Sequence, residues 1–158
     1  MIILFSLSSF LILPFWFLMI VLPYWKWTQR ILQSPLVIVP IALLYPILVL
    51  PRLGTVFVAV ASPSIASLSG LLSSPVGVTI AWIHFLAFDL FVGRWVHLDS
   101  RKRGINAWLM APILFLTLML GPIGFLLFLC VRSVPGLSSK KYNQKRSQIV
   151  ESSVSLQQ

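Results

Sequence analysis

Residues 82–95 of the chain read WIHFLAFDLFVGRW. It is strongly apolar, yet it carries His84, Asp89 and Arg94. Ionisable groups are scarce in this chain, which is 58% hydrophobic and 9% charged. Inside a membrane span each such group costs about 3 kcal/mol or more unless it is paired or hydrated, so a functional site is the default explanation for it.

The composition of the whole chain is that of a helical membrane protein. Its mean hydropathy is +0.97, and its apolar runs reach the ~20 residues that a helix needs to cross a bilayer. The runs are continuous and do not alternate as the strands of a membrane barrel do. The net charge of +9 resides mostly in loops and in the tail, as is usual in membrane proteins. We therefore expect membrane lipid, and not nucleic acid, as a partner.

The apolar runs predict an all-α, polytopic membrane protein with four transmembrane helices. The expected spans are about residues 2–22, 31–50, 77–96 and 107–131, within a membrane domain of residues 1–131. Prolines punctuate the second span, which should be irregular and packed against protein. Between spans two and three, Ser62-Pro63 is typical of a helix start and predicts a short interfacial helix. A fifth span over residues 53–72 is the alternative, and residues 132–158 are expected to form a disordered basic tail.

Four crossings leave the orientation of the chain undecided. The loops after spans one and three share a side and carry five basic residues, namely Lys26, Arg30, Arg101, Lys102 and Arg103. The other side then carries Arg52 and five basic residues from Arg132 onward, which makes six. Five against six gives no bias under the positive-inside rule. The tail cluster at Lys140, Lys141, Lys145 and Arg146 is suited to anionic lipid headgroups.

The three ionisable residues of the third span cannot share one face of their helix. His84 and Asp89 are five residues apart, as are Asp89 and Arg94, so each pair is separated by a net angle of ~140°. His84 and Arg94 are ~15 Å apart along the axis. Arg94 is close enough to the span end to snorkel, whereas Asp89 lies near the middle and needs a partner or a ligand. His97 and Asp99 are expected in a solvated polar turn at residues 97–104.

No familiar motif of a soluble enzyme is present. The chain has no Ser-His-Asp pattern with supporting spacing, no H-E-x-x-H and no P-loop. Two histidines thirteen residues apart are a weak basis for a metal site. We therefore predict neither a metal nor a cofactor.

Several blocks together carry a resemblance to a known family. The run from Trp82 to Ser100, Leu13-Pro14-Phe15-Trp16, Leu43-Leu44-Tyr45 and Gly121-Pro122-Ile123-Gly124 resemble the abscisic-acid-deficient-four-like family, small membrane proteins of plastids and cyanobacteria. The resemblance covers about residues 5–130. It implies a multi-span protein of carotenoid metabolism, in the thylakoid or plasma membrane of a photosynthetic bacterium.

Plant members of that family are required to make neoxanthin from violaxanthin. In this isomerisation an epoxide opens as a proton leaves a neighbouring polyene carbon, giving an allene and a hydroxyl. The resemblance makes His84 and Asp89 candidate acid–base groups and Arg94 a candidate oxyanion stabiliser. Candidate substrate-lining residues are Tyr45, Trp82, Phe85 and Trp95, and candidate structural residues are Gly93, Gly121, Pro122 and Gly124.

Two other functions stay open at this point. A non-catalytic protein that binds a carotenoid, or that assembles a membrane complex or a homo-oligomer, suits the proline-broken helices and the aromatic residues equally well. A small proton-coupled transporter rests on Asp89 alone and ranks lowest.

Overall fold

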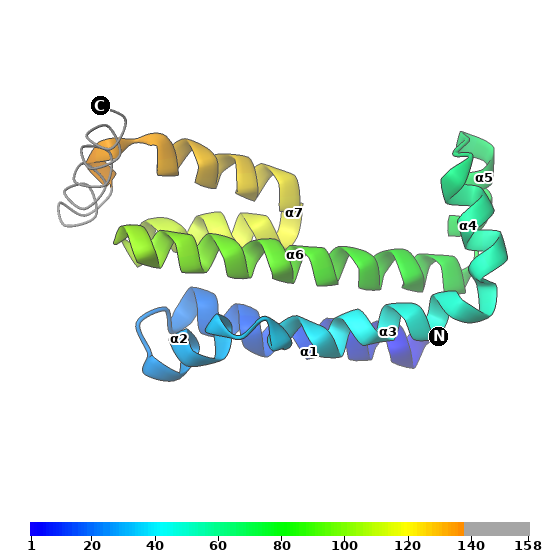
Figure 1. Cartoon of the computed structure of the whole chain (residues 1–158), viewed down its shortest axis with the longest axis horizontal. Coiled ribbons are helices and arrows are strands. Elements are labelled where there is room, and N and C mark those ends of the chain that lie inside the picture. Colours follow the sequence, from blue (N-terminus) through cyan, green and yellow to red (C-terminus); the bar gives the residue numbers. More distant parts are fainter. Residues whose placement is uncertain (138–158) are drawn as a thin grey trace, which may run out of the picture.

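The computed structural model describes residues 1–137, which are helical with no strand in that range (Figure 1). The helices are α1 (Ile2–Val21), α2 (Lys26–Gln33), α3 (Val39–Val49), α4 (Leu53–Ala61), α5 (Ile65–Leu72), α6 (Pro75–Arg103) and α7 (Ala107–Ser133). Short 3₁₀ turns cover Pro35–Ile38, Leu50–Arg52 and Pro135–Leu137. The all-α prediction is confirmed. The predicted start of the disordered tail at residue 132 is wrong, because α7 continues to Ser133 and a 3₁₀ turn covers Pro135–Leu137. The rest of the predicted tail, from residue 138 onward, lies outside the described residues.

Four helical segments are long and apolar enough to cross a membrane. They are Ile2–Val21, Pro35–Ala61, Pro75–Arg103 and Ala107–Ser133. Their number and order match the four predicted spans. The differences lie in where the segments end and in how they run.

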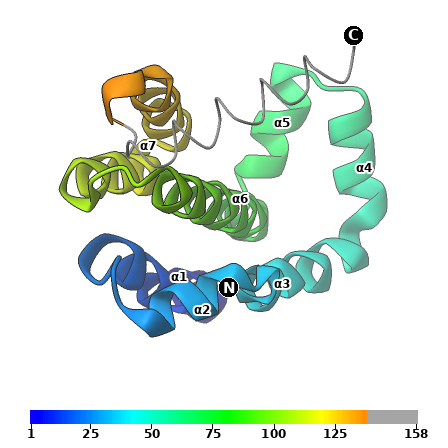
Figure 2. The ribbon, with the colours of Figure 1, turned by 60° about the vertical axis from the view of Figure 1, so that its left-hand side comes forward.

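The second segment is irregular, as its prolines predict. A 3₁₀ turn precedes α3, Pro46 lies inside it, and a second 3₁₀ turn at Leu50–Arg52 follows it. At that turn the chain leaves the bundle, and α4 and α5 stand roughly across the direction of α6 (Figures 1 and 2). The predicted short helix is α5. It begins at Ile65 and not at Pro63, because Ser64 and Ser67 form the capping box at its start.

The centre of the bundle is α6, which packs against α1, α3 and α7. Its buried residues recur every three or four positions, as in Ile80, Ile83, Leu86, Leu90 and Gly93. The helix continues to Arg103 and ends where Gly104 adopts a left-handed conformation with φ 68°. The predicted polar turn at residues 97–104 is therefore wrong: nothing before Gly104 interrupts the helix, so residues 97–103 add two more turns to α6.

The last long helix, α7, folds back on itself. Its backbone is non-helical at Leu120 and Gly121. The first arm runs along α6, and the second arm returns toward the C-terminal end of α6 (Figure 1). Arms of about 13 and 12 residues are each ~20 Å long or less, which is shorter than a ~30 Å hydrocarbon core. The candidate structural residues Gly121, Pro122 and Gly124 therefore lie where α7 reverses its direction.

This reversal changes the distribution of charge. Arg132, at the end of the second arm, lies 3.5 Å from Asp99 near the end of α6. The expected placement of Arg132 on the side opposite Arg101–Arg103 is therefore wrong. Within residues 1–137, α2 and the C-terminal ends of α6 and α7 lie at this end of the bundle (Figure 1). These segments carry the basic residues Lys26, Arg30, Arg101, Lys102, Arg103 and Arg132. Arg52 lies toward the other end, because it lines a cavity together with Ser74, the residue just before α6.

Two of the candidate structural glycines allow close packing. A side chain at Gly93 of α6 would meet the ring of Trp16, which is buried in α1. A side chain at Gly124 would meet the backbone of Thr117 in the other arm of α7. Small residues at such contacts let membrane helices approach closely.

Candidate functional site

His84 lies in a cluster of aromatic rings on the surface of the bundle. Its ring centroid is 4.7 Å from that of Phe88 and 5.5 Å from that of Tyr45 on α3. Phe85 approaches it edge-on at 6.2 Å. The side chains of Phe85 and Phe88 are 58% and 59% exposed. This aromatic cluster of His84, Tyr45, Phe85 and Phe88 is therefore accessible from the surrounding lipid.

Trp82, two residues before His84 on α6, contacts α1. Its indole Nε1 donates a hydrogen bond of 2.9 Å to the Ser9 hydroxyl. Its ring stacks on Phe5 at a centroid distance of 5.2 Å. Both contacts join α1 to α6, so Trp82 contributes to helix packing.

Asp89 lies at the break in α7. Its Oδ1 is 2.6 Å from the position that a Cβ on Gly121 would occupy. Gly121 and Pro122 begin the second arm, and the start of a helix carries unsatisfied N–H groups and a partial positive charge. The side chain is partly buried, and within residues 1–137 it makes no hydrogen bond or ion pair. Asp89 is thus a carboxylate in an apolar span that faces the start of a short helix.

Arg94 is occupied by the end of α2. Its Nε donates to the carbonyl of Leu32 at 2.6 Å, and its Nη2 donates to the carbonyl of Gln33 at 2.8 Å. These are the last carbonyls of α2, and no N–H group within the helix donates a hydrogen bond to them. Arg94 therefore fastens α2 to α6.

Trp95 points to the other side, toward α7. Its ring packs against Phe125 and Phe128 with centroid distances of 5.7 and 5.6 Å. The Arg132 guanidinium lies 5.3 Å from its centroid. These contacts hold the second arm of α7 against α6.

The three candidate catalytic residues thus have different neighbours. His84 meets the aromatic rings of α3 and α6, Asp89 meets the α7 break, and Arg94 meets the end of α2. The expectation of three separate environments agrees with this arrangement, and the structure does not bring the residues together as a triad. Tyr45 and Phe85 belong to the environment of His84, whereas Trp82 and Trp95 lie apart from it.

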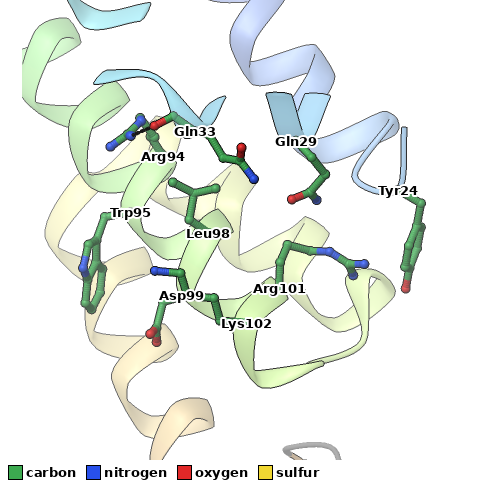
Figure 3. Close-up of a pocket in the computed structure, with 9 residues that line it drawn as sticks. All are labelled: Tyr24, Gln29, Gln33, Arg94, Trp95, Leu98, Asp99, Arg101 and Lys102. Atoms are coloured by element: carbon green, nitrogen blue, oxygen red, sulfur yellow. Dashed lines mark hydrogen bonds between the residues drawn. The ribbon is translucent and has the colours of Figure 1, made fainter. Parts of the chain in front are cut away.

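A polar cavity beside Arg94 was not foreseen. It has a volume of about 600 Å³ and lies between α2 and the last turns of α6 (Figure 3). Its lining consists of Tyr24, Gln29, Gln33, Arg94, Trp95, Leu98, Asp99, Arg101 and Lys102. The sequence held one signal for it, because Lys26 and Arg30 after the first span and the basic run at residues 101–103 were expected on the same side.

His97 and Asp99 are not solvated loop residues, and that expectation is wrong. His97 is 1% exposed, because α6 continues through it and packs it into the bundle. Asp99 Oδ2 lies 2.7 Å from Arg103 Nε on the same helix and 3.5 Å from Arg132 Nε on α7. Asp99 therefore joins the end of α6 to the returning arm.

Metal-binding groups do not cluster in residues 1–137. No set of three or more His, Cys, Asp or Glu side chains there is arranged to hold an ion. The single cysteine, Cys130, is exposed on α7.

The sequence matches a family model over most of its length. That model, described as ABA DEFICIENT 4-like, matches residues 3–128, from the start of α1 into the second arm of α7. Among curated proteins and among solved structures, none matches the chain.

Proposed function

Since the chain belongs to the ABA DEFICIENT 4-like family, we propose that it isomerises an epoxidised xanthophyll within the membrane. Family membership links the chain to carotenoid metabolism in general, and four apolar helices make it a multi-pass membrane protein. The specific step is our proposal: a neoxanthin-type conversion of an epoxide into an allene and a hydroxyl, with Asp89 moving the proton.

This isomerisation needs only a group that accepts a proton and a group that donates one. A base removes a proton from the polyene carbon next to the epoxide, and the C–H electron pair becomes a new double bond of the allene. The epoxide C–O bond breaks, its electron pair goes to oxygen, and the oxygen takes up a proton. Atoms and electrons balance without an oxidant or a reductant. One carboxyl group that reaches both positions can accept the first proton and return it to oxygen.

The position of Asp89 is the observation that carries the proposal. Of the two aspartates in residues 1–137, Asp99 is held by Arg103 and Arg132. Asp89 is partly buried in the apolar part of α6 and unbonded within the described chain. It is therefore the carboxylate that is free to exchange a proton with a ligand in the membrane.

The aromatic cluster around His84 supplies the surface on which the substrate binds in this proposal. Phe85 and Phe88 face outward, so a long polyene can reach them laterally from lipid. Flat aromatic faces pack well against a conjugated chain. His84 then provides a polar contact to the substrate within this binding surface. Arg94 contributes by holding the end of α2 in place through its hydrogen bonds.

A second function is favoured by a different observation. His84, Asp89 and Arg94 have separate partners, which suits a protein that binds a xanthophyll or a membrane complex without converting it. In that case Asp89 serves the packing of α7 and not a reaction.

Pigment analysis of a deletion strain tests the link to xanthophylls. We expect the epoxidised xanthophyll to accumulate and the allenic product to fall when the gene is removed, with recovery when the chain is restored from a plasmid. An unchanged xanthophyll profile would contradict both functions. A lower total xanthophyll content without a shift between epoxide and product would favour the binding function.

A further inference from the structure

The polar cavity at the basic end of the bundle contains more cations than its carboxylate can pair. Arg94, Arg101 and Lys102 line it, together with the amides of Gln29 and Gln33 (Figure 3). The one acidic residue in its lining is Asp99, which is engaged by Arg103 and Arg132 from outside the cavity. No carboxylate within residues 1–137 pairs with the three cations that line the cavity.

One donor in this lining is buried and unsatisfied. The Nε of Arg101 makes no hydrogen bond in the described part of the chain, while the guanidinium lies 4.2 Å from the centre of the Tyr24 ring. Buried donors without an acceptor are costly, and charged donors more so. An anion in the cavity would satisfy this group and offset the three positive charges.

A second, apolar cavity adjoins the polar one at Tyr24. It has a volume of about 420 Å³, and its other lining residues are Ile20, Val21, Pro23, Ala107, Trp108 and Ala111. Tyr24 thus borders a charged space on one side and an apolar space on the other. This arrangement suits an amphiphile and gives no advantage to a small free anion.

The surroundings place both cavities at a membrane surface. Arg101 and Lys102 follow the apolar part of α6, and Trp25 and Trp27 on the neighbouring segment are 48% and 55% exposed. Tryptophans in such positions are typical of the lipid headgroup level. The basic end of the bundle is also where anionic lipids exert their attraction.

We propose that the polar cavity binds the phosphate or sulfonate headgroup of an anionic membrane lipid, with part of an acyl chain in the adjoining apolar cavity. Arg101 and Lys102 supply the charge, and the amides of Gln29 and Gln33 supply further hydrogen bonds. The site lies apart from Asp89 and does not depend on the proposed isomerisation.

The test is a binding measurement on the purified full chain in detergent micelles. Phosphatidylglycerol and phosphatidylcholine with matched acyl chains are titrated separately, with glycerol phosphate as the soluble anion, and bound lipid is counted by native mass spectrometry. We expect phosphatidylglycerol to remain bound, and phosphatidylcholine and glycerol phosphate to dissociate at the same concentrations. Equal retention of the two lipids, or equal binding of glycerol phosphate, would overturn the proposal, and this comparison needs no variant.

Variants locate the site. Each of Arg101→Gln and Lys102→Gln should weaken phosphatidylglycerol binding about fivefold, the effect of one basic charge near a lipid surface. The charge-conserving Arg101→Lys should retain most of the binding. Lys26→Gln removes one charge from the same end but lies outside the cavity lining, so it should leave the affinity unchanged. Unchanged binding in Arg101→Gln and Lys102→Gln, or an equal loss in Lys26→Gln, would contradict this site.

Discussion

Asp89 on α6 faces Gly121 at the break in α7, with its Oδ1 2.6 Å from the position of a Cβ on residue 121. The Asp89 carboxylate in the apolar part of α6 and the reversal of α7 therefore lie at the same place in the structure. A side chain at residue 121 would meet the end of the Asp89 side chain, and the carboxylate would have to rotate away from the break. The same contact places Asp89 beside the point at which α7 reverses its direction.

The substitution Gly124→Ala should destabilise the protein. Its methyl group would collide with the backbone of Thr117 in the other arm of α7, and overpacking of this kind costs about 1–3 kcal/mol. Thermal unfolding followed by tryptophan fluorescence measures the loss. The matched control is Gly70→Ala in α5, where a Cβ meets nothing within 4 Å and alanine is the better helix former. Equal melting temperatures for the two variants would contradict the contact.

The hairpin in α7 predicts which segments share a side of the membrane. Starting from Cys130→Ser, which removes the single cysteine, single cysteines are introduced by Lys26→Cys, Ser62→Cys and Val134→Cys. An impermeant maleimide should label residues 26 and 134 from one side and residue 62 from the other. Labelling of residue 134 together with residue 62 would show that α7 crosses the membrane and would contradict the hairpin.

The same labelling fixes the orientation. With Arg132 at the same end as Arg101–Arg103, the basic residues outside the apolar core in residues 1–137 divide six to one between the two ends. Short basic segments stay on the cytoplasmic side of a membrane. In cells, residues 26 and 134 should therefore be protected from the external reagent until the membrane is permeabilised, and residue 62 should react at once.

The substitution Arg94→Lys should loosen α2. Lysine keeps the charge but lacks the planar fork that reaches the carbonyls of Leu32 and Gln33. Loss of one such bond from a charged donor costs about 2 kcal/mol, and hydrogen exchange of the α2 amides should become faster. As a control, Arg30→Lys alters a side chain that stacks on Trp27 at 6.0 Å and should change little. Normal exchange in Arg94→Lys together with lost turnover would instead favour an oxyanion role.

The number of long helices and the interfacial helix could be predicted from the sequence because local composition decides both. An apolar run that is long enough to cross a bilayer has to form a helix, because its backbone groups find no other partners there. Prolines mark where the second helical segment bends. The three separate environments of His84, Asp89 and Arg94 followed from helical geometry alone, because their angular spacing does not depend on the rest of the fold.

The course of α7 could not be predicted in this way. The Gly121–Gly124 block indicates a break, but a break is compatible with either a small bend or a reversal. The reversal is accompanied by contacts between parts of the chain that meet only after folding: Gly124 with Thr117 in the other arm of α7, and Arg132 with Asp99 on α6. The polar cavity was missed for the same reason, because α2 and the extra turns of α6 form it together.

The most direct test of the proposed chemistry is the near-isosteric change Asp89→Asn, measured as conversion of epoxidised xanthophyll per molecule of accumulated protein. The proposal predicts that the protein accumulates normally while conversion is lost, and that Asp89→Glu, which keeps a carboxylate, recovers part of it. If Asp89→Asn accumulates and converts the xanthophyll as fast as the unaltered chain, Asp89 does not move the proton and the proposed reaction site is wrong.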